Sequence, residues 1–500
     1  MSRAGRWSLG PDLFGSGQGR DACPSSTRSQ EDRFVSRRVD LLIVGAGPAG
    51  MSAATVARRH GLDVLLVDEQ PAPGGQIWRN IEQVSGTPRM SVLGKAYEEG
   101  LAVVGAFRKS GAAYEPGTQV WQIEGGARAF MTRDGAATSV EAGSLLLATG
   151  AQERPAPFPG WTLPGVMTIG AAQIVLKTSD QIPSDPVWIA GTGPLSLLYA
   201  TQLLNAGGRI AGFLDTTPPD RMARALPKFA EAAISAPADL VKGLGWLISL
   251  KRHVLFISNV AEIEAIGTNR LERIRYVTAK GRGATVDARL LFVHEGIVPT
   301  IHPTLALGCK HVWNTDQDSF APELDPWGET SESGVFVAGD GAGIGGATAA
   351  CLRGELAGLG IALKAGRLSE IEADAAAKPI RTRLKRALGS RPFLDRLYGP
   401  REKVFVPDDH TIACRCEEVT VASVRTQIAG GRPGPNQVKA FTRAGMGPCQ
   451  GRQCGYTIAR VLAAAEGRTP PDVGLYRIRP PLKPVTLGEL AALDGADQKR

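Results

Sequence analysis

Apolar and polar positions along the chain form blocks that predict buried strands followed by helices. Residues 39–70, VDLLIVGAGPAGMSAATVARRHGLDVLLVDEQ, contain an apolar strand, a glycine-rich turn that opens a helix, and a second apolar strand. Shorter apolar runs lie at 187–191 (VWIAG) and 335–339 (VFVAG), and each ends in glycine. Strands that alternate with helices in this way predict an α/β fold with parallel sheets.

The first block has the spacing of a dinucleotide-binding motif. Gly45 permits the tight turn, Gly47 lets a pyrophosphate approach the backbone, and Gly50 permits close helix packing. The helix amino terminus then faces the phosphates, and Asp68, 18 residues after Gly50, is placed to accept hydrogen bonds from a ribose. The candidate contacts of this site are Gly45, Gly47, Pro48, Ala49, Gly50, Asp68 and Glu69.

Two further segments indicate that the ligand of this first site is FAD. Residues 335–340, VFVAGD, resemble the second FAD motif of the two-dinucleotide-binding flavoproteins, in which the acid matching Asp340 holds the ribityl chain. The segment LLLATGAQERP, which starts at Leu145, resembles the central strand and turn of the same flavoproteins. With three motifs in the expected order, the FAD site is predicted to include also Gly75, Gln76, Thr149, Gly150, Gly339 and Asp340.

A second glycine motif predicts another nucleotide-binding domain, inserted between the two FAD segments. Gly191 and Gly193 match the first two glycines, Ser196 stands in place of the third, and Asp215 lies 19 residues beyond it. An acid at that position favours NAD over NADP, and serine loosens the helix packing only slightly. NAD or another adenine nucleotide is therefore an expected ligand, with a working hydride-donor site and a vestigial or structural site as open alternatives.

Four of the seven cysteines cluster near the carboxy-terminal end. Cys414-x-Cys416 is followed by Cys449-x4-Cys454. Apolar residues at helical spacing in the segments that follow place both pairs in loops just before helices, where helix dipoles favour thiolates. Four thiolates in a reducing compartment would bind zinc or an iron–sulfur cluster. The unequal spacing is less typical of zinc, whose knuckles more often use C-x2-C pairs.

Composition limits the classes of function. The 500 residues are 43% hydrophobic and 21% charged, which indicates a globular chain of about three domains. No apolar run reaches the ~18 residues of a membrane span, and no secretory signal is evident, so a cytoplasmic protein is expected. The net charge of +8 comes with no basic stripe interleaved with aromatic residues, so no nucleic-acid partner is predicted.

The remaining cysteines and histidines add little chemistry. Seven cysteines, an odd number, argue against a disulfide framework. No cysteine lies between Cys23 and Cys309, which argues against a disulfide reductase with a redox pair beside the flavin. His294, at the end of an apolar strand, is expected to be a packed residue rather than a catalytic base. No catalytic residue is therefore assigned.

Several less generic segments resemble one family, the A, or alpha, subunits of heteromeric amino-acid dehydrogenases. This family includes the octopine and nopaline oxidases, hydroxyproline dehydrogenase and hydrogen cyanide synthase. The resemblance covers roughly residues 39–480. The segments that carry it are VDEQPAPGGQIWR (67–79), PGWTLPGVMTIGAAQ (159–173), HEGIVP (294–299), CRCEEV (414–419) and TRAGMGPCQGRQCG (442–455).

The resemblance implies that this chain is the electron-transferring flavin and iron–sulfur subunit of such an enzyme. Its carboxy-terminal domain would resemble the bacterioferritin-associated ferredoxin module and bind a [2Fe–2S] cluster through Cys414, Cys416, Cys449 and Cys454. A dehydrogenase (beta) subunit with the substrate flavin would oxidise the C–N bond of an opine or a hydroxyproline-like secondary amine. Further implied partners are a small ferredoxin-like subunit, and a quinone or cytochrome acceptor that would bring the complex to the inner membrane.

Two other functions remain open. The chain could be a self-sufficient NADH-dependent reductase that passes electrons through FAD to the cluster, or a flavoprotein whose carboxy-terminal module binds zinc and serves for docking. NADH reactivity separates the first alternative from the subunit interpretation. The iron and sulfide content of the protein tests the zinc-binding alternative.

The expected architecture is a two-dinucleotide-binding-domain flavoprotein with a small cluster domain. A Rossmann-like FAD domain carries an inserted NAD-type domain. The predicted boundaries are a disordered tail (1–38), the FAD-binding domain (39–160 and 300–370), the second dinucleotide-binding domain (161–299), a helical connector (371–405), the [2Fe–2S] domain (406–480) and a second tail (481–500).

Overall fold

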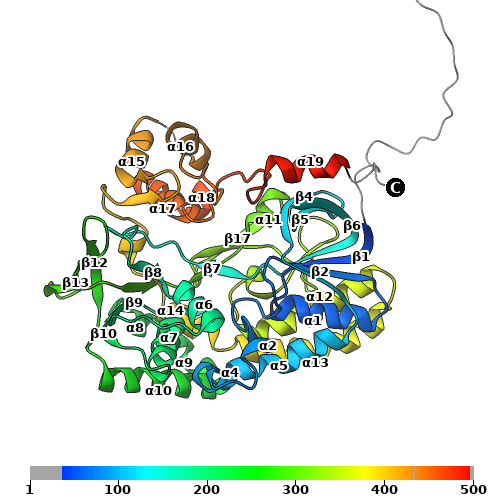
Figure 1. The fold of residues 1–500 in the computed structure, drawn as a ribbon, viewed down its shortest axis with the longest axis horizontal. Helices are drawn as coiled ribbons and strands as arrows, with labels where there is room; N and C mark the ends of the chain where they lie inside the picture. Colours follow the sequence, from blue (N-terminus) through cyan, green and yellow to red (C-terminus); the bar gives the residue numbers. More distant parts are fainter. Residues whose placement is uncertain (1–36, 432–433, 496–500) are drawn as a thin grey trace, which may run out of the picture.

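The computed structural model describes residues 37–431 and 434–495. A mixed sheet and a parallel sheet form the body of the protein, and a small helical domain packs on them (Figure 1). The disordered tail predicted at the amino terminus lies, up to residue 36, outside the described residues. Among the described residues, no helix is long and apolar enough to cross a membrane.

The larger sheet combines strands from two separate parts of the chain. Its order is β3-β2-β1-β6-β5-β4, and β19 pairs in parallel with the end of β6. Strands β1, β2, β3 and β6 are parallel, whereas β4, β5 and β6 form an antiparallel meander. The strands are β1 (Arg37–Val44), β2 (Val64–Asp68), β3 (Ala113–Pro116), β4 (Gln119–Glu124), β5 (Arg128–Arg133), β6 (Ala136–Leu147) and β19 (Val335–Val337).

Helices cover one face of this sheet, and the carboxy-terminal domain packs toward the other. Leu41 and Ile43 of β1 belong to the core under the helices, while Leu42, which points the opposite way, belongs to a core that continues into the carboxy-terminal domain. The helices of this half are α1 (Pro48–Arg59), α2 (Ile81–Val84), α3 (Arg89–Leu93), α4 (Lys95–Glu98), α5 (Gly100–Lys109), α11 (His302–Ala306), α12 (Ala347–Lys364) and α13 (Glu370–Leu388).

The second sheet is wholly parallel, with the order β11-β10-β9-β15-β8. A three-stranded antiparallel sheet, β12-β13-β14, lies beside it. The strands are β8 (Val166–Thr168), β9 (Val187–Gly191), β10 (Ile210–Asp215), β11 (Phe256–Ile257), β12 (Val260–Ile266), β13 (Arg273–Thr278), β14 (Gly283–Asp287) and β15 (Leu291–His294). The helices are α6 (Ile169–Ser179), α7 (Pro194–Asn205), α8 (Arg221–Ala225), α9 (Phe229–Ser235) and α10 (Pro237–His253).

A two-stranded ribbon joins the two halves where the chain leaves and re-enters the first one. It consists of β7 (Ala151–Glu153) and β16 (Ile297–Pro299), which pair antiparallel. A hairpin of β17 (His311–Asn314) and β18 (Ser319–Pro322) follows. After α13, the connector continues through α14 (Arg391–Leu397), which packs on α8 and α9 through the core residue Phe393.

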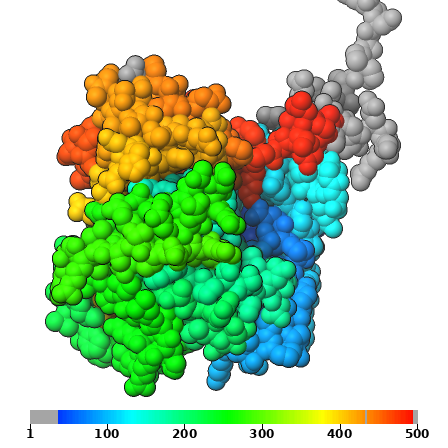
Figure 2. All heavy atoms as spheres, turned by 60° about the vertical axis from the view of Figure 1, so that its left-hand side comes forward, coloured from blue at the N-terminus to red at the C-terminus, as the bar shows by residue number. Residues whose placement is uncertain are grey.

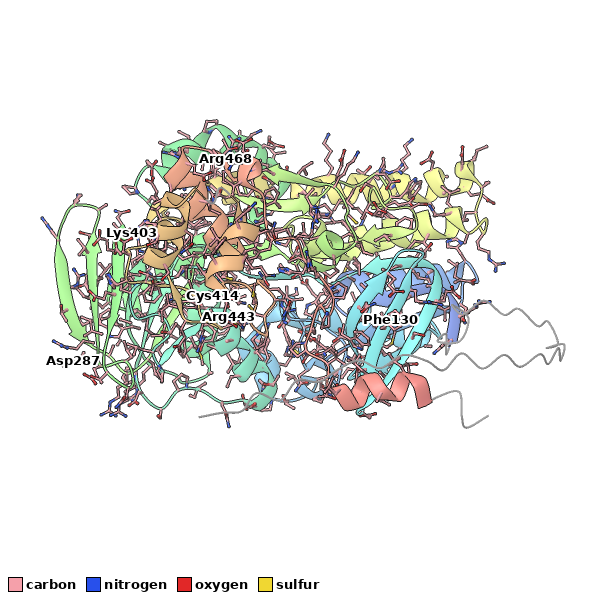
Figure 3. All side chains as sticks on the ribbon, turned by 90° about the horizontal axis from the view of Figure 1, so that it is seen from above. Phe130, Asp287, Lys403, Cys414, Arg443 and Arg468 are labelled. Carbon is pink, nitrogen blue, oxygen red and sulfur yellow. The ribbon has the colours of Figure 1, made fainter. Side chains whose placement is uncertain are left out.

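The carboxy-terminal domain is built from short helices, and an arm then returns to the first sheet. The domain contains β20 (Ile412–Cys414), β21 (Val419–Thr420), α15 (Val421–Ala429), α16 (Pro435–Thr442), α17 (Gly455–Glu466) and α18 (Pro470–Val473). The arm leads to α19 (Leu487–Gly495), which lies beside β6, in the sheet that carries Phe130 (Figure 3). Residues 481–495 of the predicted second tail therefore form an arm and a helix.

Candidate functional site

The turn between β1 and α1 has the form that a dinucleotide-binding loop requires. Gly45 has a φ of +111°, and a Cβ there would lie 2.5 Å from the carbonyl oxygen of Ala148. A Cβ at Gly50 would lie 2.0 Å from the carbonyl oxygen of Gly45. Both positions therefore exclude any side chain. Pro48 and Ala49 form the first turn of α1, whose free N–H groups face the loop.

A second loop packs directly on the first. Gly75, with a φ of +60°, lies so close that a Cβ there would be 2.9 Å from the Cα of Gly47. The buried Lys177 of α6 holds this loop, because its Nζ donates hydrogen bonds to the carbonyl oxygens of Gln76 and Ile77, at 3.0 Å each. Burial lowers the pKa of Lys177 to about 7. Sequence reasoning missed Lys177, although a lysine within the apolar run of 169–179 was a signal.

Backbone N–H groups orient both acids of the predicted FAD site. Asp68 Oδ2 accepts a hydrogen bond from the Ala46 N–H at 2.5 Å, and its Oδ1 accepts one from the Gln70 N–H at 2.7 Å. Burial raises the pKa of Asp68. Asp340 Oδ1 accepts hydrogen bonds from the N–H groups of Gly345 and Gly346, at 2.8 and 3.0 Å. The turns after β1 and β2 thus fix the Asp68 carboxylate, and the turn after β19 fixes the Asp340 carboxylate.

The predicted FAD-site segments converge at one edge of the sheet. They follow the carboxyl ends of β1, β2, β6 and β19, where ligands of open α/β sheets bind. A Cβ at Gly339 would lie 3.0 Å from the Cβ of Ala49, and one at Gly341 would lie 3.4 Å from the carbonyl oxygen of Gly150. Thr149 Oγ1 donates to the carbonyl oxygen of Thr300 at 3.4 Å. The segments are therefore neighbours in space, and their roles toward FAD remain predictions.

The second glycine motif also gathers its predicted residues at the ends of two parallel strands. A Cβ at Gly191 would lie 2.3 Å from the carbonyl oxygen of His294, so β9 and β15 approach closely there. The buried Ser196 Oγ donates to the carbonyl oxygen of Gly193 at 2.7 Å, so this hydroxyl is used within the turn. Asp215 Oδ1 accepts a hydrogen bond from the Thr217 N–H at 3.0 Å, and burial raises the pKa of Asp215.

A residue of the connector lies against this second motif. The Tyr398 side chain, just after α14, packs on Gly193, where an added Cβ would lie 3.7 Å from the Cβ of Tyr398. Burial and the nearby Asp215 carboxylate raise the pKa of the Tyr398 phenol. A nucleotide in this second site would have to pack beside the Tyr398 ring. Sequence reasoning missed Tyr398 because it is about 200 residues distant from the motif.

The four clustered cysteines lie in two contacting pairs. The thiols of Cys414 and Cys454 are hydrogen-bonded to each other, and so are those of Cys416 and Cys449. Each pair joins one cysteine of the C-x-C segment to one of the C-x4-C segment. The hydrogen bond from Cys454 lowers the pKa of Cys414 to about 6, which favours a thiolate at neutral pH.

Small residues and one tyrosine hold the two cysteine segments together. A Cβ at Gly447 would lie 2.3 Å from the Cβ of Cys416, so the segments are in direct contact. The Tyr476 ring packs on Gly445 and Gly451, where an added Cβ would lie 2.7 Å from the ring at each position. Tyr476 Oη lies 3.9 Å from Cys454 Sγ. Tyr476 therefore borders the thiol site from outside the cysteine motif.

The four thiols supply cysteine donors, and which metal group they bind is a prediction. Within residues 37–431 and 434–495, no group of three or more Cys, His, Asp or Glu side chains is arranged to hold a metal ion. A [2Fe–2S] cluster with four cysteine ligands takes two thiolates for each iron. The two contacting pairs have the number of thiols that such a cluster would need.

The thiol site packs against β7, the strand that follows the predicted flavin turn. Gln152 of β7, two residues after Gly150, donates from Nε2 to the carbonyl oxygen of Arg452, at 2.9 Å. Arg452 lies between Cys449 and Cys454 in the sequence. On α17, Arg460 forms an ion pair with Asp318. The cysteine loop and the predicted flavin turn are therefore joined by a single side chain.

The next two residues along the chain, Glu153 and Arg154, form hydrogen bonds with other parts of the protein. His294 Nδ1 lies 2.8 Å from Glu153 Oε1, and the histidine is buried. Arg154 donates to the carbonyl oxygens of Gln317 and Asp318, at 2.7 and 2.9 Å. Burial lowers the pKa of Arg154 to about 10. The ribbon is thus attached at three points. Gln152 binds the carboxy-terminal domain, Glu153 binds the second sheet, and Arg154 binds the hairpin of β17 and β18 in the first half.

Comparisons with known proteins identify relatives along most of the chain. Residues 39–354 match the family model described as pyridine nucleotide-disulphide oxidoreductase, and residues 411–494 match the sarcosine oxidase A3 domain. The opine oxidase A subunit of Agrobacterium tumefaciens (strain Ach5) is 43% identical over 464 residues, which cover 91% of this chain and 92% of that protein. The hydrogen cyanide synthase subunit HcnB of Pseudomonas protegens is 33% identical, with coverage of 89% and 96%.

A solved structure has the same fold at low sequence identity. The crystal structure of L-proline dehydrogenase from P. horikoshii aligns with a TM-score of 0.67 and 21% identity, over 91% of this chain and 80% of that one. The family model covers both halves of the predicted FAD site, and the opine oxidase relative extends the match into the cysteine domain. The chain therefore belongs to the pyridine nucleotide-disulphide oxidoreductase family of FAD-dependent oxidoreductases, in which it groups with the A subunits of opine oxidases.

Proposed function

We propose that this chain is the electron-transferring flavin and iron–sulfur subunit of a heteromeric dehydrogenase that oxidises the C–N bond of an opine or a related secondary amine. The names of its relatives support this interpretation, because they are subunits of opine oxidase and hydrogen cyanide synthase. The substrate class rests on these names. The cofactor arrangement rests on the geometry of this chain.

The observation that carries the proposal is the hydrogen bond between Gln152 and the Arg452 carbonyl oxygen. It joins the strand after the predicted flavin turn to the loop that bears Cys449 and Cys454. Electron transfer between two cofactors requires them to be held close together. A direct contact between the two loops meets that requirement.

The residues of this chain would position cofactors. The loops around Gly45, Gly75, Gly150 and Asp340 would hold FAD, and Cys414, Cys416, Cys449 and Cys454 would hold a [2Fe–2S] cluster. When bound, these groups supply the capacity to accept and release electrons. NAD or another adenine nucleotide is the proposed ligand of the motif around Gly193, in which Ser196 and Tyr398 are already engaged.

A partner protein would carry out the amine oxidation. The three polar residues of the ribbon beside the flavin turn, Gln152, Glu153 and Arg154, each bind another part of the protein and present no free acid or base to an amine. We therefore assign the substrate flavin to a dehydrogenase (beta) subunit. The proposed cytoplasmic complex is completed by a downstream acceptor together with a small ferredoxin-like subunit.

The test is a spectrum of the anaerobically purified chain, recorded before and after excess NADH, together with iron, sulfide and zinc analysis. We expect flavin and cluster absorption bands, about two iron and two sulfide per chain, and no change with NADH. Bleaching of both bands by NADH would instead establish a self-sufficient NADH-dependent reductase. Zinc without sulfide would refute the cluster and leave a docking module.

A matched pair of variants tests the ligand assignment. Cys449→Ser is expected to abolish the cluster bands while FAD stays bound. Cys309→Ser, at a buried cysteine outside the thiol site, should leave both sets of bands unchanged. A normal cluster in Cys449→Ser would rule out this cysteine as a ligand.

A further inference from the structure

The arm between α18 and α19, residues 474–486, runs from the thiol site to the predicted FAD site. Its first part contains Tyr476, which borders Cys454. Further on, the Leu482 N–H donates to the carbonyl oxygen of Trp121 on β4, at 2.6 Å, and the Gln119 Nε2 donates to the carbonyl oxygen of Pro484 at 3.0 Å. Figure 2 shows the arm (red) crossing the surface from the carboxy-terminal domain toward the first half.

The arm is also fixed from the cysteine loop. Arg452 Nη1 donates to the carbonyl oxygen of Leu482 at 2.8 Å. Leu482 is buried against the core that the first sheet shares with the carboxy-terminal domain. The backbone on the amino-terminal side of Lys483 is therefore held at two points, which fixes where that lysine can reach.

Lys483 reaches the two acids at the end of β2. Its Nζ forms an ion pair with Glu69, although 414 residues separate the two in the sequence. Burial lowers the pKa of the Lys483 ammonium, and the nearby Asp68 carboxylate acts in the opposite direction. Asp68 is the acid that the dinucleotide motif assigns to the ribose.

We propose that Lys483 is a dinucleotide-binding residue that closes the adenosine end of the FAD site. Burial raises the pKa of Asp68, and the Lys483 ammonium opposes that shift. It therefore favours the ionised carboxylate, which is the stronger acceptor for hydrogen bonds from ribose hydroxyls. The ion pair with Glu69 also fixes the arm beside the two acids that end β2. This inference rests on the proposed FAD site and does not depend on the iron–sulfur cluster.

The test compares Lys483→Met with Lys280→Met, which removes an exposed lysine from the β13–β14 hairpin. Binding of FAD, ADP and FMN to the flavin-depleted chain is measured by calorimetry, and the rate of FAD release by fluorescence. We expect Lys483→Met to weaken FAD and ADP binding by about tenfold and to speed FAD release. FMN, which lacks the adenosine, should bind as it does to the unchanged protein.

A purely structural role of Lys483 gives a different pattern. The melting temperature would then fall equally with and without FAD, while the FAD and ADP affinities stay unchanged, and the proposal would be overturned. If Lys483→Met does not fold, Lys483→Gln, which keeps a polar side chain but removes the charge, is expected to weaken ADP binding in the same way. Wild-type protein that binds no FAD would refute the FAD site itself, a result distinct from an unchanged variant.

Discussion

Arg452 shows how one residue of the cysteine loop can serve several neighbours. Its carbonyl oxygen accepts the hydrogen bond from Gln152, and its guanidinium group donates to the carbonyl oxygen of Leu482. The thiols of Cys449 and Cys416 lie close enough to act on the Arg452 charge, while burial lowers its pKa. A cation beside thiol groups favours their ionised form. Arg452 therefore contributes charge as well as contacts.

His302, on which the charge of Arg452 in the cysteine loop acts, is expected to make the stability of the protein sensitive to acid. Burial, with the charge of Arg452 as a second cause, lowers the pKa of His302 to about 3. The unfolded chain binds this proton near pH 6.5. Between pH 6.5 and pH 3 the unfolded state therefore holds more protons, so the free energy of unfolding falls as the pH falls. We expect His302→Gln to remove this dependence.

The measurement is urea unfolding at pH 7.5 and pH 5. When the pH is lowered from 7.5 to 5, the unfolding free energy of both proteins is compared. The decrease should be larger for the wild-type protein than for His302→Gln, by at most about 2 kcal/mol. His410→Gln, at an exposed histidine, is the control and should behave like the wild type. Parallel pH profiles for wild type and His302→Gln would contradict the buried, neutral state of His302.

At the scale of elements, the contact between α1 and α12 supports the dinucleotide loop. A Cβ at Gly354 would lie 2.1 Å from the Ala49 carbonyl oxygen in the first turn of α1. Gly354→Ala must therefore push the two helices apart. We expect a loss of about 1–3 kcal/mol in unfolding free energy and weaker FAD binding.

Gly105→Ala on α5 is the matched control for this substitution. A Cβ at Gly105 meets no heavy atom within 4 Å, so alanine there should be neutral or stabilise the helix by about 0.5–1 kcal/mol. Denaturant unfolding and FAD titration of both variants separate packing from helix propensity. Equal FAD affinity in the two variants would show that the dinucleotide loop does not depend on this helix contact.

Local sequence patterns predicted the strands and helices around each glycine motif. They did not predict the contacts between residues that are distant in the sequence. Strands β1, β2, β9 and β19 lie where apolar runs end in glycine or an acid, because each motif is encoded within a few residues. The contact of Lys483 with Glu69 spans 414 residues and has no local signature. The pairing of Cys414 with Cys454, and not with Cys416, depends likewise on how two segments meet.

At the scale of the whole molecule, exposed apolar side chains concentrate on one group of helices. Val241, Leu244 and Ile248 are spaced i, i+3, i+7 on α10 and are exposed, while Trp246 and Leu250 pack toward the core. The exposed large apolar residues from α8 to β11 are Met222, Leu226, Phe229, Ile234, Val241, Leu244, Ile248 and Leu255. We expect exposed apolar side chains gathered on neighbouring helices to form an interaction surface.

The proposed dehydrogenase subunit is the partner that we expect on this surface. Residues 221–253 carry six Lys and Arg against two Asp and Glu, which calls for an acidic rim around the apolar centre of the partner. The relatives at 43% and 33% identity are both named as subunits, which supports the expectation that another subunit binds this surface. This surface lies on the second half, so its occupant would leave the thiol domain uncovered for an electron acceptor (Figure 1).

A pair of charges on α10 should therefore block assembly without affecting the cofactor sites. We expect Leu244→Glu/Ile248→Glu to bind FAD normally but to lose at least tenfold in affinity for the co-expressed dehydrogenase subunit, because two carboxylates would be buried at the interface without partners. Ile371→Glu, at an exposed isoleucine of α13, is the control and should assemble normally. Co-purification and sedimentation velocity give the measurement. Normal assembly of the double variant would place the partner elsewhere, and wild-type binding to anionic vesicles that the same substitutions abolish would identify this surface as a membrane contact.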